Sequence, residues 1–160
     1  QPYENLTYYG RGPFENYIDR YSGAFIGRYE DKVENQFYWY IRPQETGNKT
    51  DVRWLTLLDS GGLGVKITGL QPISFSALHF SPEDLDPGLT RKLQHTIDIV
   101  PQKNIFLHVD LKQRGLGGDN SWGMYPHNEY RLLDKKYTYS YMIELVEKGS
   151  DKNDYLNSRK

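Results

Sequence analysis

Cysteine is absent from all 160 residues. Its absence excludes disulfides, cysteine-ligated zinc sites and thiol catalysis, and it leaves the redox compartment undecided. No run approaches the roughly 20 apolar residues that a membrane-spanning helix needs. The first residues also lack the pattern of a signal peptide. The sequence therefore predicts no membrane partner, and it does not decide the compartment.

An excess of charge of either sign is missing as well. Lysine and arginine total 20 and the acidic residues total 21, for a formal net charge of −1. Binding to nucleic acid or to anionic lipid depends on positively charged surfaces. We expect neither of them as a main partner.

Recognisable catalytic and metal-binding motifs are missing too. No metal-ligand spacing and no nucleophile motif accompany the four histidines, His79, His95, His108 and His127. Two of them, His79 and His108, lie on predicted strands, where a histidine that is hydrogen-bonded or solvated is the better interpretation. The stretch 84–88 opens like a calcium loop but lacks the closing glutamate, which makes a turn the better interpretation. Carboxylates are plentiful, yet no two are paired as glycoside hydrolysis requires. The sequence predicts no complete active site and no cofactor within these residues.

Aromatic residues are abundant, at 14% of the chain with 14 tyrosines, alongside 15 glycines and 8 prolines. This composition favours many short strands joined by tight turns. It also suits sugar binding, because the C–H face of a pyranose packs on an aromatic ring. Most of the tyrosines are expected to be half-buried sheet residues with hydrated hydroxyls.

Alternating patterns predict the strands. Residues 104–111 and 135–147 alternate clearly, and 51–69 predicts a hairpin around a turn at 59–62. Residues 36–43 and 73–80 are weaker strand candidates, and we expect Trp54, on an alternating strand, to be a core residue. The one helical patch lies in 81–95, where Ser81 can cap and Pro87-Gly88 cuts the helix short.

These patterns indicate an all-β, antiparallel β-sandwich with long loops. No internal repeat or linker divides the chain, so we expect one sandwich domain over residues 1–148 and a polar tail over 149–160. The strand pattern begins almost at residue 1. We therefore expect a domain that is truncated at its N-terminal side.

Two loops carry interleaved charges of both signs, at 8–20 and 41–55. Such interleaving favours a hydrogen-bonded, partly buried network over a hydrated face. The alternative of direct substrate contact stays open. The predicted network consists of Arg11, Glu15, Asn16, Asp19, Arg20, Arg42, Glu45, Asp51 and Arg53.

Three stretches carry a family resemblance: "YYGRGPFENYIDR" (8–20), "YIRPQETGNKTDVRWL" (40–55) and "LKQRGLGGDNSWG" (111–123). In this order they resemble the C-terminal, small-chain domain of the β-galactosidases of glycoside hydrolase family 2, over about residues 4–147. "YIDR" stands where the family more often has "YPDR", and "PQETG" where it more often has "PQENG". Both changes leave the charged residues in place.

The resemblance implies a supersandwich of the galactose-mutarotase type, of which this chain is the C-terminal portion. It implies a parent enzyme that hydrolyses terminal β-D-galactosides, with its catalytic glutamates on a TIM barrel. Mg²⁺ and a monovalent cation would be bound by that barrel. The partners would be the other domains of the parent, the galactoside substrate and further copies of an oligomer.

The resemblance also implies a role for Trp122, which matches the tryptophan that the family delivers into the mouth of the active site to stack on substrate. Three glycines, Gly115, Gly117 and Gly118, would allow backbone conformations forbidden to a side chain. Asp119 and Asn120 would hold the turn through bonds to nearby backbone groups. Without the resemblance, a tryptophan buried in the core would be the more ordinary interpretation.

Two other functions stay open. An independent carbohydrate-binding module would suit the aromatic content, but such modules usually display several aromatic residues on one surface. A purely structural or assembly domain is compatible with the galactosidase interpretation.

Overall fold

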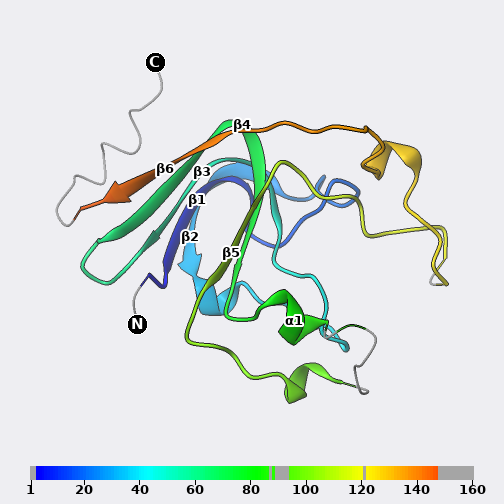
Figure 1. Ribbon diagram of the computed structural model, residues 1–160, viewed down its shortest axis with the longest axis horizontal. Helices are drawn as coiled ribbons and strands as arrows, with labels where there is room; N and C mark the ends of the chain where they lie inside the picture. Colours follow the sequence, from blue (N-terminus) through cyan, green and yellow to red (C-terminus); the bar gives the residue numbers. More distant parts are fainter. Residues whose placement is uncertain (1–2, 87, 89–93, 121, 148–160) are drawn as a thin grey trace.

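The computed structural model describes residues 3–86, 88, 94–120 and 122–147. These residues form one six-stranded antiparallel sheet with only short helical turns (Figure 1). The strands are β1 (Asn5–Gly12), β2 (Phe25–Lys32), β3 (Lys49–Leu58), β4 (Gly64–Leu78), β5 (Phe106–Asp110) and β6 (Tyr141–Val146). The helical turns are η1 (Val33–Asn35), α1 (Pro82–Leu85), η3 (Thr96–Asp98) and η4 (Asn128–Tyr130). The all-β, antiparallel fold class is confirmed, and a single sheet of this kind is what one part of a β-sandwich provides.

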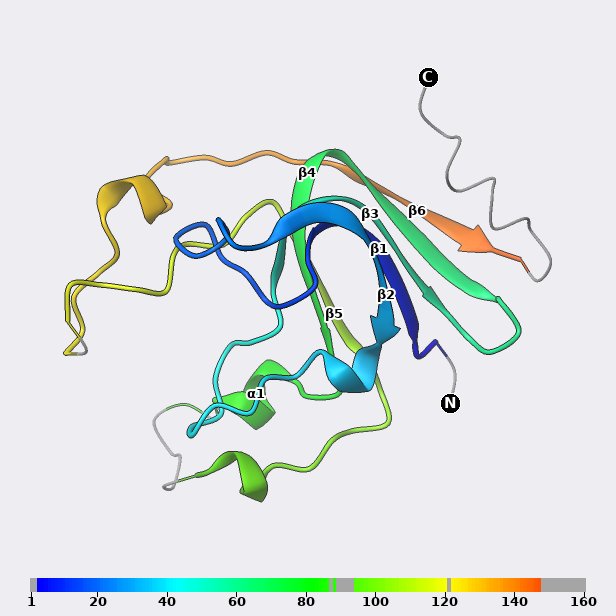
Figure 2. The same cartoon turned by 180° about the vertical axis from the view of Figure 1, so that it is seen from behind.

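Strand β4 organises the sheet. The strand order is β2-β1-β3-β4-β5, and β6 pairs with β4 as well. The first half of β4 (64–69) pairs with β6 and the second half (74–78) with β5, and the long ribbon of β4 bends along its length (Figures 1 and 2). The predicted hairpin is present between β3 and β4, where the Asp59 carboxylate accepts hydrogen bonds from the Gly61 and Leu63 amides at 2.7 and 2.9 Å.

One face of the curved sheet carries the main core. Alternating positions of β1, β3, β4 and β5 converge there because side chains i and i+2 of a strand point to the same face. The buried cluster includes Leu6, Tyr8, Val33, Val52, Leu55, Leu57, Ile67, Ile73, Phe75 and Ala77. Tyr29, Val65 and the alternate residues of β5 pack against it.

The prediction that Trp54 is a core residue is wrong. Trp54 is half-buried, pairs with Tyr9 of β1 and Thr68 of β4, and lies outside the core cluster. The register of β3 against β4 shifts between Val52 and Trp54. Simple alternation therefore fails at this point, and Leu55 takes the buried place.

The strand predicted at 36–43 is also wrong. This segment makes no strand pairing, and its aromatic side chains pack on one another, on Phe80 and against Glu15 instead. Phe37 packs on Phe80 with ring centroids 4.5 Å apart, and the Tyr40 hydroxyl reaches the Glu15 carboxylate. Apolar, aromatic-rich composition alone does not distinguish a loop whose side chains pack in this way from a strand of a sheet.

The predicted strand at 135–147 begins later than expected. β6 starts at Tyr141, and its predicted apolar face is open to solvent, with Ile143 61% and Leu145 83% exposed. Because β6 joins the sheet at an outer edge, backbone pairing with β4 holds it, with little side-chain burial.

The helical patch is short. Ser81 caps α1 through a capping box with Asp84, as the sequence predicts, and α1 ends at Leu85. Pro87 and residues 89–93 of the predicted patch lie outside the described residues. Leu85 joins Phe37, Leu78, Phe80 and Ile99 in a second, smaller core cluster.

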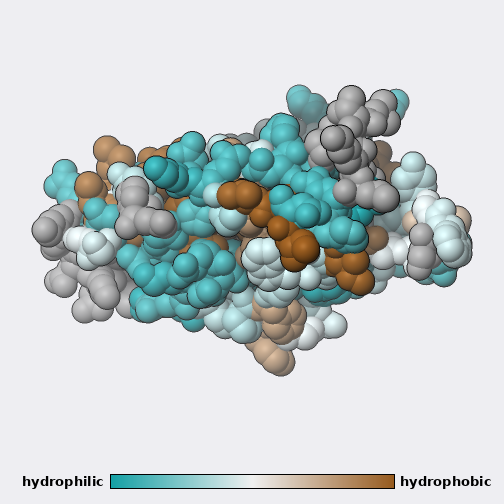
Figure 3. Space-filling view, turned by 90° about the horizontal axis from the view of Figure 1, so that it is seen from below, coloured by the Kyte–Doolittle hydropathy of each residue, from teal (hydrophilic) through white to brown (hydrophobic). Residues whose placement is uncertain are grey.

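The surface near α1 and η3 is mostly hydrophilic, with small and separate apolar patches (Figure 3). Ile97 and Val100, in the segment before β5, are among the exposed apolar residues. None of the described helices is long and apolar enough to cross a membrane.

A lysine is buried at the start of β3. Lys49 is 1% exposed, and its Nζ donates to the Gly47 carbonyl at 3.1 Å. Burial lowers the pKa of Lys49 to about 8, although the negative charges of Glu15 and Asp31 act in the opposite direction. The protonated lysine is therefore a cost to the folded state.

The stability of the chain is predicted to rise between pH 8 and about 10. In that interval the unfolded chain keeps the Lys49 proton and the native chain releases it, which favours the native state by on the order of 3 kcal/mol in total. Above pH 10 the trend reverses, because burial raises the pKa of Tyr17 above its unfolded value. Urea unfolding from pH 7 to 9.5 measures the rise.

Lys49→Met should flatten this rise, while Lys103→Met, at an exposed position, should leave it intact. Parallel pH profiles for the wild type and Lys49→Met would show that Lys49 is not the group responsible.

Candidate functional site

A buried carboxylate lies at the centre of the predicted network. Glu15 is completely buried and accepts hydrogen bonds from Thr46 Oγ1 at 3.0 Å, the Gly47 amide at 2.8 Å, Arg20 Nη2 at 3.2 Å and the Tyr40 hydroxyl. Burial raises the pKa of Tyr40, and the bond to Glu15 raises it further, so this hydroxyl stays protonated and donates. These contacts tie the 8–20 loop to the 40–47 segment.

The neighbouring amide extends the same link. Asn16 is completely buried, donates through Nδ2 to the Arg11 and Phe14 carbonyls, and accepts at Oδ1 from the Thr50 amide and hydroxyl. Its backbone exchanges two further bonds of 2.8 Å with Asn48. Asn16 therefore hydrogen-bonds to Asn48 and Thr50, at the start of β3, in the way that a neighbouring strand would.

A second group of charges lies on the outer side of β1 and β3. Arg11 Nε pairs with Asp51 Oδ2 at 2.5 Å, and its Nη1 donates to the Ala24 carbonyl at 2.9 Å. Arg53 donates to the Asp51 carbonyl and lies over the Tyr9 ring. Residues 8–12 and 49–55 of the two predicted loops are strand, so this group joins β1 to β3. Among the described residues, it makes no hydrogen bond to Glu15.

Glu45 and Arg42 occupy a different place. Both line a cavity of about 510 Å³ between the 42–45 segment, α1 and β5, with Arg42 exposed and Glu45 half-buried. The Tyr17 hydroxyl donates to Glu45 Oε1 at 3.4 Å. Burial raises the pKa of Glu45, against the opposing effects of His108 and Gln113. Arg42 lies apart from the Glu15 group.

Asp19 connects the 8–20 loop to the loop that carries Trp122. Residues 113–120 and 122–131, which we call the Trp122 loop, follow β5 and project from the end of the sheet away from the β3–β4 turn (Figures 1 and 2). Asp19 Oδ2 accepts from the Gly117 amide at 2.7 Å. Its Oδ1 is buried and has no hydrogen-bond partner in the described part of the chain.

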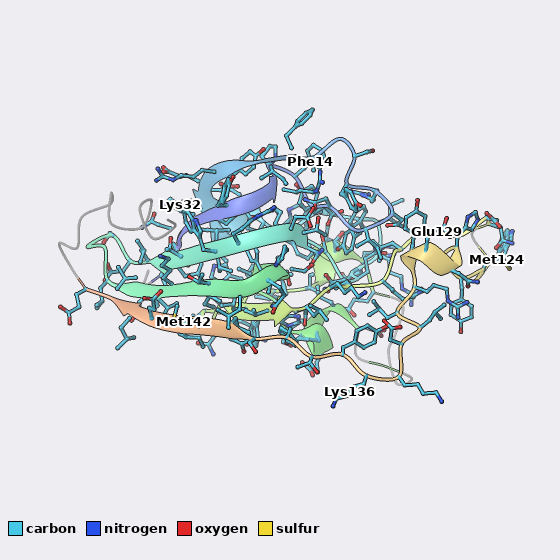
Figure 4. All side chains as sticks on the ribbon, turned by 90° about the horizontal axis from the view of Figure 1, so that it is seen from above. Phe14, Lys32, Met124, Glu129, Lys136 and Met142 are labelled. Carbon is cyan, nitrogen blue, oxygen red and sulfur yellow. The ribbon has the colours of Figure 1, made fainter. Side chains whose placement is uncertain are left out.

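Trp122 is 91% exposed. Asn120 Oδ1 accepts from its backbone amide at 2.8 Å, which is the local turn bond expected of Asn120. Met124 and Glu129 of the same loop lie at the end of the molecule opposite Lys32 and Met142 (Figure 4). The loop therefore presents Trp122 to solvent, away from both core clusters.

The three glycines of this loop serve a different purpose from the one predicted. None has a positive φ, and the left-handed glycine of the loop is Gly123. They are required for space instead. A Cβ on Gly115 would lie 2.7 Å from the Asp19 carboxyl carbon, one on Gly117 would lie 3.3 Å from Asp19 Oδ2, and one on Gly118 would lie 2.3 Å from the Met124 carbonyl oxygen.

One contact in this loop is not predictable from the sequence. His127 Nε2 lies 2.7 Å from Asp119 Oδ1, so Asp119 binds a side chain rather than nearby backbone. The two residues are eight positions apart in the sequence, and this spacing belongs to no recognised motif. The bend that brings them together is visible only in three dimensions.

Within the described residues, no group of three or more histidines and acids is arranged to hold a metal ion. The arrangement suits stacking and hydrogen bonding, because it combines an exposed indole with polar groups beside it. Asp119, Met124, Tyr125, His127, Glu129 and Arg131 line a shallow hollow of about 620 Å³ in the same loop.

Replacing Glu15 is predicted to cost far more stability than replacing its charged partner. Glu15→Ala leaves the Thr46 and Gly47 donors buried and unpaired, at about 1–3 kcal/mol for each donor, and should lower the free energy of unfolding by roughly 2–6 kcal/mol. Arg20 is 49% exposed and water can replace its bond, so Arg20→Ala should cost less than about 1 kcal/mol. Denaturant unfolding of both variants measures the difference, and equal losses would contradict the central place of Glu15.

Asp19→Ala is predicted to loosen the Trp122 loop. Without the carboxylate acceptor, the Gly117 amide should exchange with solvent about tenfold faster, which corresponds to about 1.4 kcal/mol. Amide hydrogen exchange measures this change. Asp98→Ala removes a similar carboxylate–amide bond, to His95, and should leave Gly117 unchanged. Unaltered Gly117 exchange in Asp19→Ala would refute the link.

Comparison with known proteins supports one family. Residues 1–143 match the model of the beta galactosidase small chain. The beta-galactosidase of Priestia megaterium is 38% identical over 143 residues, which cover 89% of this chain and 13% of the relative. That of Streptococcus thermophilus is 38% identical over 144 residues, covering 89% and 14%. That of Photobacterium profundum is 32% identical over 139 residues, covering 87% and 12%.

The chain thus spans about an eighth of the length of these curated relatives. The match covers nearly all of the described sheet and the whole Trp122 loop. This chain belongs to the β-galactosidase small-chain family.

Proposed function

We propose that this chain is the non-catalytic C-terminal part of a β-galactosidase and that Trp122 completes the mouth of an active site on another domain. The observation that supports this role is the 91% exposure of Trp122 on a loop whose backbone is tied down on both sides. An exposed tryptophan on a held loop is an unusual use of a large apolar side chain unless something packs on it.

The chemistry of the indole suits a sugar. The C–H face of a galactoside can stack on the ring, and a tryptophan with two side-chain torsions loses little entropy when it binds. By analogy with other aromatic contacts, the stack would contribute about 1–2 kcal/mol. The Asn120 bond to the Trp122 amide orients the backbone that carries the ring.

The reaction of the parent would be hydrolysis of terminal, non-reducing β-D-galactosides such as lactose, with retention through a covalent galactosyl-enzyme. The two glutamates of that mechanism, the Mg²⁺ and the monovalent cation would belong to the TIM barrel of glycoside hydrolase family 2. This chain's partners would then be that barrel, the substrate and, in a homo-oligomeric parent, further copies. By itself the chain should be inactive.

One observation bears on the alternative of a stand-alone carbohydrate-binding module. A second tryptophan, Trp39, is 64% exposed. It lies in the 36–43 segment, where its ring packs edge-on against Phe37 with ring centroids 4.9 Å apart. That segment is separate from the Trp122 loop (Figures 1 and 2). The two rings do not form one platform, which favours the galactosidase role. A structural or assembly role is compatible with it.

Trp122→Ala in the full-length enzyme is predicted to lower kcat/KM for a chromogenic β-galactoside by about 5- to 30-fold, which is the loss of about 1–2 kcal/mol of stacking. Steady-state kinetics measure this change, with circular dichroism to verify folding. Trp39→Ala is the matched control, since it removes an equally large exposed ring from another segment.

Unchanged kinetics in Trp122→Ala would refute the role of this side chain. Hydrolysis by the isolated 160-residue chain would overturn the proposal altogether. Tight galactoside binding by that chain, without hydrolysis, would favour the binding-module alternative.

A further inference from the structure

The Trp122 loop is closed by contacts between its two arms. The Gly115 amide donates to the Tyr130 carbonyl at 2.7 Å, near the base of the loop. Further out, Gly118 passes so close to Met124 that a Cβ would lie 2.3 Å from its carbonyl oxygen. The third contact joins the Asp119 and His127 side chains, which flank Trp122 along the chain.

His127 is held in place from the base of the loop. It is the residue before η4, and the Tyr130 amide donates to its carbonyl at 2.9 Å. Tyr130 is in turn fixed to Gly115. The backbone position of His127 is therefore set at the base of the loop, where Tyr130 meets Gly115, and not at the tip that carries Trp122.

The opposite arm depends on fewer contacts. After the Gly117 amide bond to Asp19, the described hydrogen bonds of this arm are the Asp119–His127 contact and the turn bond of Asn120 to the Trp122 amide. The His127 contact is thus the one that joins the tip of this arm to the rest of the loop. Removing it leaves the tip of this arm held by the Gly117–Asp19 bond and by the close approach of Gly118 to Met124.

The charges around His127 favour this contact. Asp119 Oδ1 lies 2.7 Å from Nε2, and Glu129 Oε1 lies 4.0 Å from Nδ1 on the other side of the ring. The hydrogen bond to Asp119 and the charges of both acids raise the pKa of His127. Arg131 lines the same hollow as an opposing cation, but its guanidinium is directed to Asn128 and to the Tyr125 ring.

We propose that His127 is a positioning residue for Trp122: its Nε2–H donates to Asp119 and holds the Trp122 turn in the orientation that meets the galactoside. Both side chains are more than half exposed, so the bond contributes little to overall stability. Its effect is on the placement of one ring. This inference rests on the proposed role of Trp122.

A kinetic cycle in the full-length enzyme tests the proposal. His127→Ala and Asp119→Ala should each lower kcat/KM for a β-galactoside about 3-fold or more, and the double variant should lose no more than either single one. In a Trp122→Ala background, His127→Ala should have no further effect. His127→Gln, whose amide nitrogen can take the place of Nε2, should restore most of the activity, and His95→Gln is the neutral control.

The outcomes separate the two proposals. No effect of Trp122→Ala would refute the proposed function. A clear effect of Trp122→Ala with wild-type kinetics in His127→Ala would refute only the positioning role. A His127→Ala effect that persists unchanged in the Trp122→Ala background would also refute it, because His127 would then act by another route.

A second measurement does not depend on activity. NMR titration of the 160-residue chain should show a higher pKa for His127 in the wild type than in Asp119→Asn. The Trp122 amide should exchange with solvent several-fold faster in that variant. An identical His127 titration in both proteins would show that the contact is absent in solution.

Discussion

The buried side chains of Glu15 and Asn16 are the constraint on which the rest of this structure depends. Two adjacent polar residues, both completely buried, accept hydrogen bonds from segments 25 to 34 positions away in the sequence. A half-satisfied carboxylate in this position would be worse than an apolar residue. Their full hydrogen bonding explains why loops of irregular backbone can cover one end of the sheet.

This constraint reaches Trp122 through a short chain of contacts. Asp19 lies three residues after Asn16, and its carboxylate holds Gly117 at the start of the Trp122 loop. The two charged loops and the glycine-rich stretch are therefore one assembly. In the sequence they are marked by charges of both signs beside glycines, and in the structure these residues form a hydrogen-bonded support for the loop that carries Trp122.

The strands with alternating polarity, and the turns whose side chains bond to nearby backbone, were predictable from the sequence. The β3–β4 turn with Asp59 and the Ser81 cap of α1 were both predictable, because each depends on residues only a few positions apart. The strand at 36–43 failed because its aromatic residues serve distant partners. The Asp119–His127 contact was missed for the same reason, since two exposed residues of ordinary type gain meaning only from the bend between them.

Strand β4 also determines where the Trp122 loop is attached. β5 and β6, the two stems that flank the Trp122 loop, both pair with β4, one with each half of the strand. Both ends of the loop therefore lead back to the same strand, and the Asp19 carboxylate holds the loop from a second element, the segment after β1. The place from which Trp122 projects is thus defined by three attachments that lie far apart in the sequence.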